Sequence, residues 1–164
     1  MNASDRGAVT LRRARPQDRP ALIRLMAALN EFEAAIEENR ADASAAEGHL
    51  DWVQGEIERL GGVTLVAELQ GAVAGFLCYT FEEDPGTFVR PERRRHALIW
   101  DISVAEEARG QGVGQALLDA AEEEARTAGV GEIRLYVLEV NSRARRIYEE
   151  AGYRNYERLM SKRL

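Results

Sequence analysis

The chain reads Arg109-Gly110-Gln111-Gly112-Val113-Gly114 between an apolar run at residues 98–104 and a strongly amphipathic segment. This order predicts a strand, a glycine turn and the open N-terminus of a helix, an arrangement suited to holding a pyrophosphate. Gly112 and Gly114 have no Cβ, so the main chain can approach a bulky anion while unpaired amides point at it. The helix dipole adds partial positive charge, and Arg109 adds a full charge.

Two other phosphate-binding motifs do not fit this stretch. A dinucleotide fingerprint needs G-x-G-x-x-G, but Gln115 or Leu117 occupies the third glycine position, depending on the starting glycine. A P-loop needs Gly-Lys-Ser/Thr, and none follows. The pattern that remains is R-x-x-G-x-G, for which a simple helix-capping turn with incidental glycines is the alternative.

A second informative segment follows a strand-like run at residues 132–140. It reads Asn141-Ser142-Arg143-Ala144-Arg145-Arg146-Ile147-Tyr148-Glu149-Glu150-Ala151-Gly152-Tyr153. Apolar residues recur at helical spacing, Asn141 or Ser142 can cap the helix, and Gly152 can end it in a left-handed turn. The same spacing turns Tyr148 inward.

Together the two segments resemble the GNAT superfamily of acyl-CoA-dependent N-acetyltransferases. Its acyl-CoA signature is R-x-x-G-x-G, and its second signature is N-x-x-A-x-x-x-Y-x-x-x-G-F/Y; both occur here in order within residues 96–155. The resemblance implies an α/β fold with a mixed sheet of about six or seven strands flanked by about four helices. In that fold the central parallel strands splay apart to admit the cofactor.

The remaining sequence agrees with such a fold. One helix should present a single apolar face formed by Leu22, Leu25, Met26, Leu29, Phe32 and Ile36. A hairpin is expected around Gln70-Gly71. Residues 82–92 should form a long connection near the substrate entrance. The other expected elements are strands at 9–15, 63–69, 72–81, 93–104 and 132–140, helices at 46–60 and 112–128, and one or two short strands within 153–164.

Length and composition indicate a single globular domain. We expect residues 9–164 to form this domain, after an extended or disordered N-terminus at residues 1–8. The hydrophobic fraction of 45% separates the chain from disordered proteins, and the net charge of −6 argues against a general nucleic-acid binder. Cys78 is the only cysteine, which favours a reducing, cytoplasmic location. No stretch is long and apolar enough to suggest a membrane partner.

The resemblance also implies a cofactor site. Acetyl-CoA would be the co-substrate, with no metal. Its pantetheine arm would lie along Ile102, Ser103 and Val104, where side-chain identity matters less than the main-chain path. Its pyrophosphate would meet Arg109 and the amides of Gly110, Gln111, Gly112, Val113, Gly114 and Gln115. Further cofactor contacts would come from Asn141 and Arg143.

Two residues are candidates for proton transfer. By resemblance Tyr148 is the acid that protonates the leaving thiolate; the alternative is an inward-facing core tyrosine. Asp101 interrupts an apolar strand, and alternation places it with Ile99 and Ser103, opposite Trp100 and Ile102. It is the candidate base, unless it is a paired or capping carboxylate. A water relay is the other alternative, and the outside candidates for the base are Glu82, Glu83, Glu31 and Glu33.

Two functions are therefore open. The first is transfer of an acetyl group from acetyl-CoA to a primary amine of a small molecule or protein, by direct attack in a ternary complex. The second is a non-catalytic acyl-CoA-binding regulatory module. The family resemblance further suggests a homodimer formed through the C-terminal strands. His49 and His96 are isolated in the sequence and suggest no metal site.

Overall fold

A computed structural model describes residues 8–164, so the predicted extended or disordered N-terminus lies outside the described residues except for Ala8. A mixed sheet has the strand order β1-β2-β3-β4-β5. Neighbouring strands are antiparallel from β1 to β4, whereas β5 is parallel to β4. The strands are β1 (Thr10–Arg13), β2 (Val63–Leu69), β3 (Ala72–Glu83), β4 (Arg95–Val104) and β5 (Ile133–Leu135).

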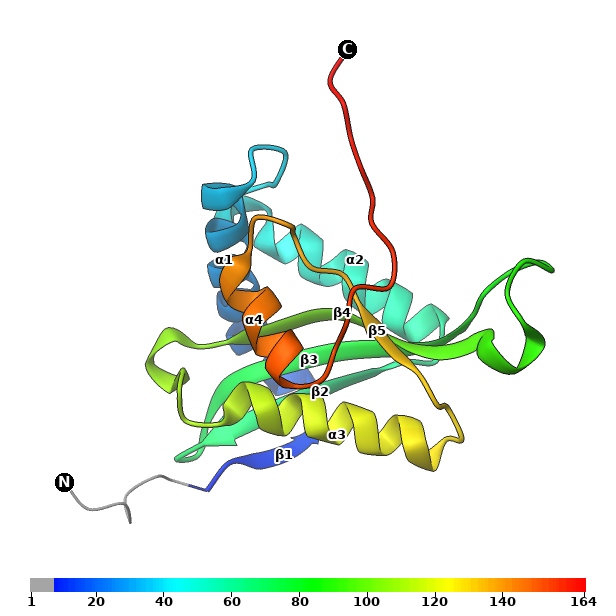
Figure 1. Cartoon of the computed structure of the whole chain (residues 1–164). Helices are drawn as coiled ribbons and strands as arrows, with labels where there is room; N and C mark the ends of the chain where they lie inside the picture. The colour runs from blue at the N-terminus through cyan, green and yellow to red at the C-terminus, as the bar shows by residue number, and fades with distance from the viewer. Residues whose placement is uncertain (1–7) are drawn as a thin grey trace.

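Helices cover both faces of this sheet (Figure 1). The helices are α1 (Arg19–Ile36), α2 (Ala46–Arg59), α3 (Val113–Thr127) and α4 (Ser142–Glu150). On one face, apolar side chains of α1 and α2 bury Val66 and Phe76. On the other face, α3 packs over Leu77 and Ile99, and Tyr148 of α4 joins this second cluster. The mixed α/β fold and its helical cover are therefore as predicted.

The predicted hairpin between β2 and β3 is confirmed. Gln70 and Gly71 join the strands with φ values of 53° and 80°. Positive φ at both central residues gives the turn the twist of the flanking strands.

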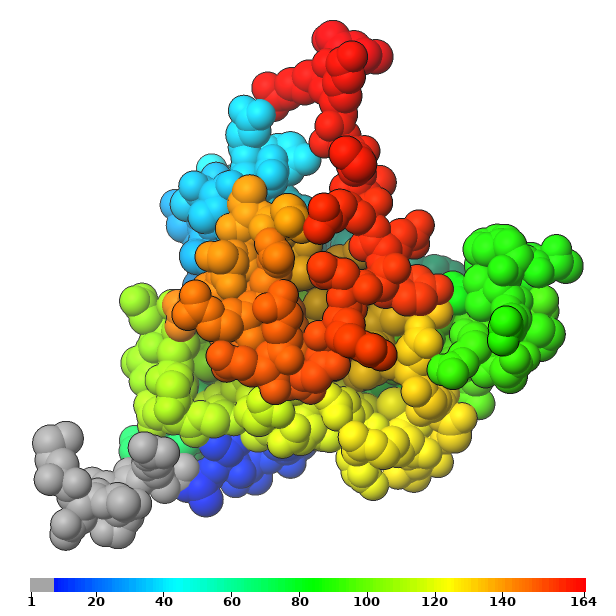
Figure 2. All heavy atoms as spheres, in the orientation of Figure 1, coloured from blue at the N-terminus to red at the C-terminus, as the bar shows by residue number. Residues whose placement is uncertain are grey.

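The sheet is smaller than predicted, with five strands in the described residues where six or seven were expected. The run at residues 132–140 yields only the three residues of β5, because it pairs with β4 no further than Leu135. Residues 153–164 form no strand. Leu159 and Met160 are 97% and 85% exposed, so the core does not cover the end of this segment. Figure 2 shows this end, in red, projecting beyond the body of the molecule.

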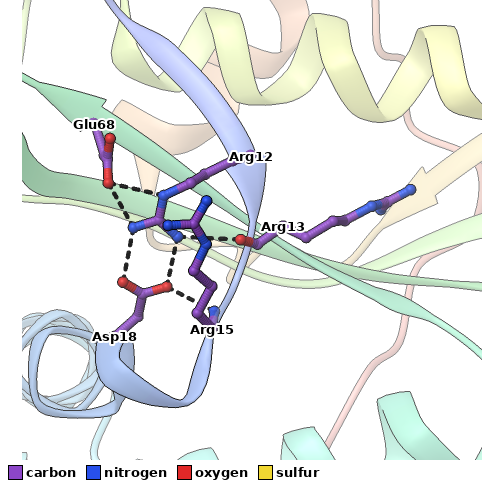
Figure 3. A network of polar contacts seen from close by, with 5 residues as sticks. All are labelled: Arg12, Arg13, Arg15, Asp18 and Glu68. Carbon is purple, nitrogen blue, oxygen red and sulfur yellow. Dashed lines mark hydrogen bonds and ion pairs between the residues drawn. The ribbon is translucent and has the colours of Figure 1, made fainter.

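A partly buried ion-pair network holds the start of α1 (Figure 3). The Arg12 guanidinium of β1 donates to both Asp18 oxygens, at 2.7 and 2.8 Å, and to Glu68 of β2 at 2.8 Å. Asp18 also accepts from the Arg15 amide at 2.7 Å. The hydrogen bonds from Arg12 lower the pKa of Asp18 to about 2. The network therefore ties α1, which carries part of the candidate site, to two strands.

Candidate active site

A cavity opens where β4 and β5 stop pairing. The parallel register ends at Ile99 opposite Leu135. Beyond that point the two segments line one cavity of about 340 Å³, through residues 100–104 on one side and 136–138 on the other. Phe32 and Glu33 of α1, the N-terminus of α3 and Tyr148 of α4 also line it.

The glycine stretch forms an amide-rich edge of this cavity. Gly110 and Gly112 have φ values of +74° and +85°, and the space where a Cβ would lie at either position is empty. Gly112 precedes the first residue of α3 without any side-chain cap. The first intrahelical bond runs from the Ala116 amide to the Gly112 carbonyl at 2.9 Å, so the amides of residues 113–115 have no acceptor within the helix.

These amides can hold an anion. The helix dipole adds positive potential at this end, and Arg109 lines the same cavity. The predicted phosphate residues that meet at the cavity are Arg109, Gly110, Gly112, Val113, Gly114 and Gln115. Gln111 does not line the cavity, because its side-chain amide turns back to donate to the Glu107 carbonyl at 2.8 Å.

The end of β4 offers main-chain groups to a ligand. Ile102, Ser103 and Val104 line the cavity, and among the described residues no strand pairs with them on the side of β5. The Ser103 hydroxyl is buried and donates to the Leu25 carbonyl of α1 at 2.9 Å. The hydroxyl proton of Ser103 is therefore already used within the fold, and its main chain remains the group that an added extended segment would pair with.

The second predicted segment also reaches the cavity. Asn141 and Arg143 both line the cavity. The Asn141 side-chain oxygen Oδ1 accepts from the Ala144 amide at 3.0 Å, which confirms that Asn141 caps α4. The Arg143 side chain is exposed and remains available to an anionic group.

Tyr148 faces the cavity from α4. Burial raises the pKa of its hydroxyl to about 12, and the negative charges of Glu33 and Asp101 act in the same direction. The phenol therefore stays protonated at neutral pH. It can donate a proton to an atom that gains negative charge in the cavity.

Asp101 faces the same cavity from β4. Burial is the main reason that the pKa of its carboxyl rises to about 7; Glu33 raises it further, and Arg40 opposes the change. A carboxyl with a pKa near neutrality can act as a base at physiological pH, unlike an ordinary aspartate.

A β-bulge changes the expected direction of Asp101. Cys78 of β3 pairs with Asp101, but the next residue, Tyr79, pairs with Ile99, so Trp100 has no partner. Trp100 and Asp101 consequently both face α1 and α2, while Ile99 lies in the opposite core. The prediction that Asp101 shares a side with Ile99 and opposes Trp100 is wrong, because the extra residue shifts the alternation by one.

Sequence reasoning missed His49, which lies beside Asp101. Its Nε2 atom on α2 is 3.8 Å from Asp101 Oδ2. Its Nδ1 atom is 2.8 Å from Asn30 Oδ1 on α1, and Asn30 is only 5% exposed. The available signal was Asn30 itself, a polar side chain on the apolar face of the first helix, because a buried amide needs a partner.

The other carboxylates weighed as bases differ in position. Glu33 lines the cavity, and its nearest cation is Arg40, at 3.6 Å. Glu82 accepts from the Thr80 hydroxyl at 2.7 Å, and neither Glu82 nor Glu83 is among the cavity residues. Within residues 8–164 no group of three or more His, Cys, Asp or Glu side chains is arranged to hold a metal ion.

The chain belongs to the GNAT acetyltransferase family, whose sequence model matches residues 25–153. An acetyltransferase from Trypanosoma brucei has a similar structure, with 25% identity, a TM-score of 0.66, and coverage of 96% of this chain and 100% of that one. A transcriptional regulator from Bacillus halodurans C-125 is similar at 22% identity, a TM-score of 0.74, and coverage of 96% and 100%. No curated protein matches the sequence.

An aminoglycoside N-acetyltransferase solved in complex with CoA shares the fold at 14% identity and a TM-score of 0.67. The match covers 96% of this chain and 95% of that chain. The family generally uses acetyl-CoA. An acyl-CoA is therefore the ligand to compare with the amide-rich edge and the open end of β4.

The first prediction tests this edge. A Cβ at Gly114 would meet only the Val104 side chain, at 3.6 Å, so the fold can accept Gly114→Val while the larger side chain narrows the space beside the free amides. Affinity for CoA, measured by calorimetry, should fall by about tenfold or more. Gly131→Val is the matched control, since a Cβ there meets nothing within 4 Å. Unchanged CoA affinity in a folded Gly114→Val protein would contradict the assignment.

The second prediction concerns the stability cost of Asp101. Its pKa is raised from 3.8 to about 7, so the folded state binds this proton more tightly than the unfolded state does. The free energy of unfolding therefore falls as pH rises from about 4 to about 7. Asp101→Asn should therefore have a melting temperature at pH 8 equal to or above that of the parent chain, with the gain disappearing near pH 4.

Asp18→Asn provides the opposite control. The pKa of Asp18 is lowered, so its contribution is present above about 3.8 and is lost as pH falls towards about 2. Its replacement should lower the melting temperature at pH 8. Destabilisation by Asp101→Asn at pH 8 would instead indicate a structural carboxylate.

Proposed function

We propose that residues 9–164 form one domain that transfers an acetyl group from acetyl-CoA to a primary amine of a small molecule or protein, by direct attack in a ternary complex. The observation that carries this proposal is the presence in one cavity of four parts. They are an amide-rich helix start, an open strand end, a buried phenol and a carboxyl with a pKa near 7.

The residues of the cavity fit acetyl-CoA. The free amides of residues 113–115, with Arg109 beside them, suit its pyrophosphate, and Arg143 suits a second anionic group. The open main chain of residues 102–104 suits the amide-containing pantetheine arm. Acetyl-CoA supplies the acetyl group as a thioester.

Proton balance assigns separate roles to the two catalytic side chains. A primary ammonium, with an ordinary pKa of about 10.4 for a lysine-like amine, must lose one proton before attack and a second after its nitrogen bonds to the carbonyl carbon. Asp101, in its ionised form, accepts protons from this nitrogen. Tyr148 donates its proton to the sulfur as the carbon–sulfur bond breaks, and is reprotonated by the second amine proton through Asp101. The first proton leaves the site.

A non-catalytic acyl-CoA-binding module is the alternative, and one protein with this fold is named a transcriptional regulator. Thiol release from acetyl-CoA across a panel of amines separates the two functions. Turnover with any amine supports the transferase. Tight CoA binding without turnover on any amine supports the alternative.

The proposal includes a homodimer in the cytoplasm. Exposed apolar side chains at Tyr136, Leu159 and Met160 favour self-association, and the single cysteine, Cys78, is buried and free. Across residues 8–164, the helices are all too short or too polar to cross a membrane.

The third prediction tests the acid. Tyr148→Phe keeps the ring and its contact with Tyr153, whose ring centroid is 5.9 Å away, but removes the proton donor. Turnover should fall on the order of 10²-fold while the Kd for acetyl-CoA changes little. Tyr156→Phe, outside the cavity, is the matched control. Full activity of Tyr148→Phe, measured where chemistry limits the rate, would remove Tyr148 from the mechanism.

A further inference from the structure

His49 connects the buried base to the surface. Its imidazole on α2 contacts two other elements: Asp101 on β4 through Nε2, at 3.8 Å, and Asn30 on α1 through Nδ1, at 2.8 Å. The side chain of Asp101 is 12% exposed, whereas that of His49 is 30% exposed. His49 therefore offers a route from the carboxyl to solvent that is separate from the cavity Asp101 also lines.

Asn30 determines which nitrogen can accept a proton. The Asn30 oxygen near Nδ1 can only accept a hydrogen bond, so neutral His49 carries its proton on Nδ1. The lone pair then lies on Nε2, the atom nearer to Asp101. Asn30 is itself nearly buried and cannot turn away without losing its partner.

Proton balance leaves one proton to be removed from this site. The ammonium loses two protons in each turnover, and the CoA thiol keeps only one of them. Asp101 must pass on the other before it can serve again. Its low exposure limits direct exchange with water.

We infer that His49 is the proton exit of the active site, taking the released proton from Asp101 on Nε2 and giving it to solvent. Asn30 is a positioning residue that holds the receiving tautomer. The inference rests on the proposed transferase function. The 3.8 Å separation is longer than a hydrogen bond, but a small rotation of either side chain or one bridging water closes it, as is usual for catalytic contacts before substrate binds.

The electrostatic surroundings make His49 a transient carrier of the proton. Burial and the charge of Arg40 lower the pKa of His49, while burial and the charge of Glu33 raise that of Asp101. Tyr148 faces Asp101 from α4 and remains neutral below its pKa of about 12. Both shifts favour the proton on Asp101, so the imidazolium form of His49 is short-lived and gives its proton to water instead of retaining it.

Two variants separate proton exit from a structural role. His49→Asn can still donate to Asn30 but lacks Nε2, and His49→Ala leaves space for added imidazole. Both should lower kcat by about tenfold or more at pH 7 with little change in the KM for acetyl-CoA. Added imidazole should restore the rate of His49→Ala in proportion to its concentration. It should not restore Asp101→Asn, which lacks the donor.

A titration of the free protein gives an independent measurement. The chain has only two histidines, so loss of one signal in His49→Asn assigns both imidazole resonances. Burial and the charge of Arg40 should make His49 titrate below its ordinary pKa, and the nitrogen-15 shifts of the neutral ring should show its proton on Nδ1.

The outcomes distinguish the relay from the proposed function. Activity of His49→Asn within twofold of the parent chain, or a loss in His49→Ala that imidazole does not repair, would overturn the proton exit while leaving the transferase intact. Absence of turnover in the parent chain with every amine would overturn both. A neutral His49 ring that carries its proton on Nε2 would also contradict the relay.

Discussion

The site depends on the point at which β4 loses its parallel neighbour. β4 pairs with β3 along most of its length, from Arg95 to Val104, but with β5 only as far as Ile99. The main chain that follows is paired with β3 on one side and is open on the other. The free end of α3 and Tyr148 of α4 line the space so created. Main-chain polar groups buried without partners are costly, so this open end favours a ligand that supplies hydrogen bonds.

The extra residue in β4, Trp100, determines the direction in which the Asp101 carboxyl points. Without the bulge at Trp100, Asp101 would point towards the core under α3; with it, the carboxyl points towards His49 and α1. The indole of Trp100 also packs in the cluster formed with α1 and α2, and its nitrogen donates to Thr80 at 2.8 Å. The bulge is therefore anchored by packing and by a hydrogen bond, and the direction of Asp101 is fixed with it.

The parts of the fold that local sequence determines were predictable. Glycine spacing located the start of α3, Asn141 the start of α4, and Gln70-Gly71 the hairpin. The bulge in β4 could not be predicted, because the order of apolar and polar residues along the strand does not show whether one residue is left unpaired. The short length of β5 could not be predicted either, because it depends on where β4 diverges from β5. His49 and Asp101 meet only through the packing of α2 against the sheet, which no local pattern records.

The basicity of Asp101 is a property of several elements acting together. Burial on β4 raises its pKa; Glu33 on α1 adds a like charge, and Arg40 after α1 reduces the effect. Glu33 is itself partly desolvated, which raises its own pKa, and it contacts Arg40 at 3.6 Å. The position of α1 relative to β4 thus controls the strength of the base. That position is held by Arg12 and Asp18 at one end of the helix and by the Ser103–Leu25 hydrogen bond nearer its middle, so interactions remote from the reacting atoms help to set the chemistry.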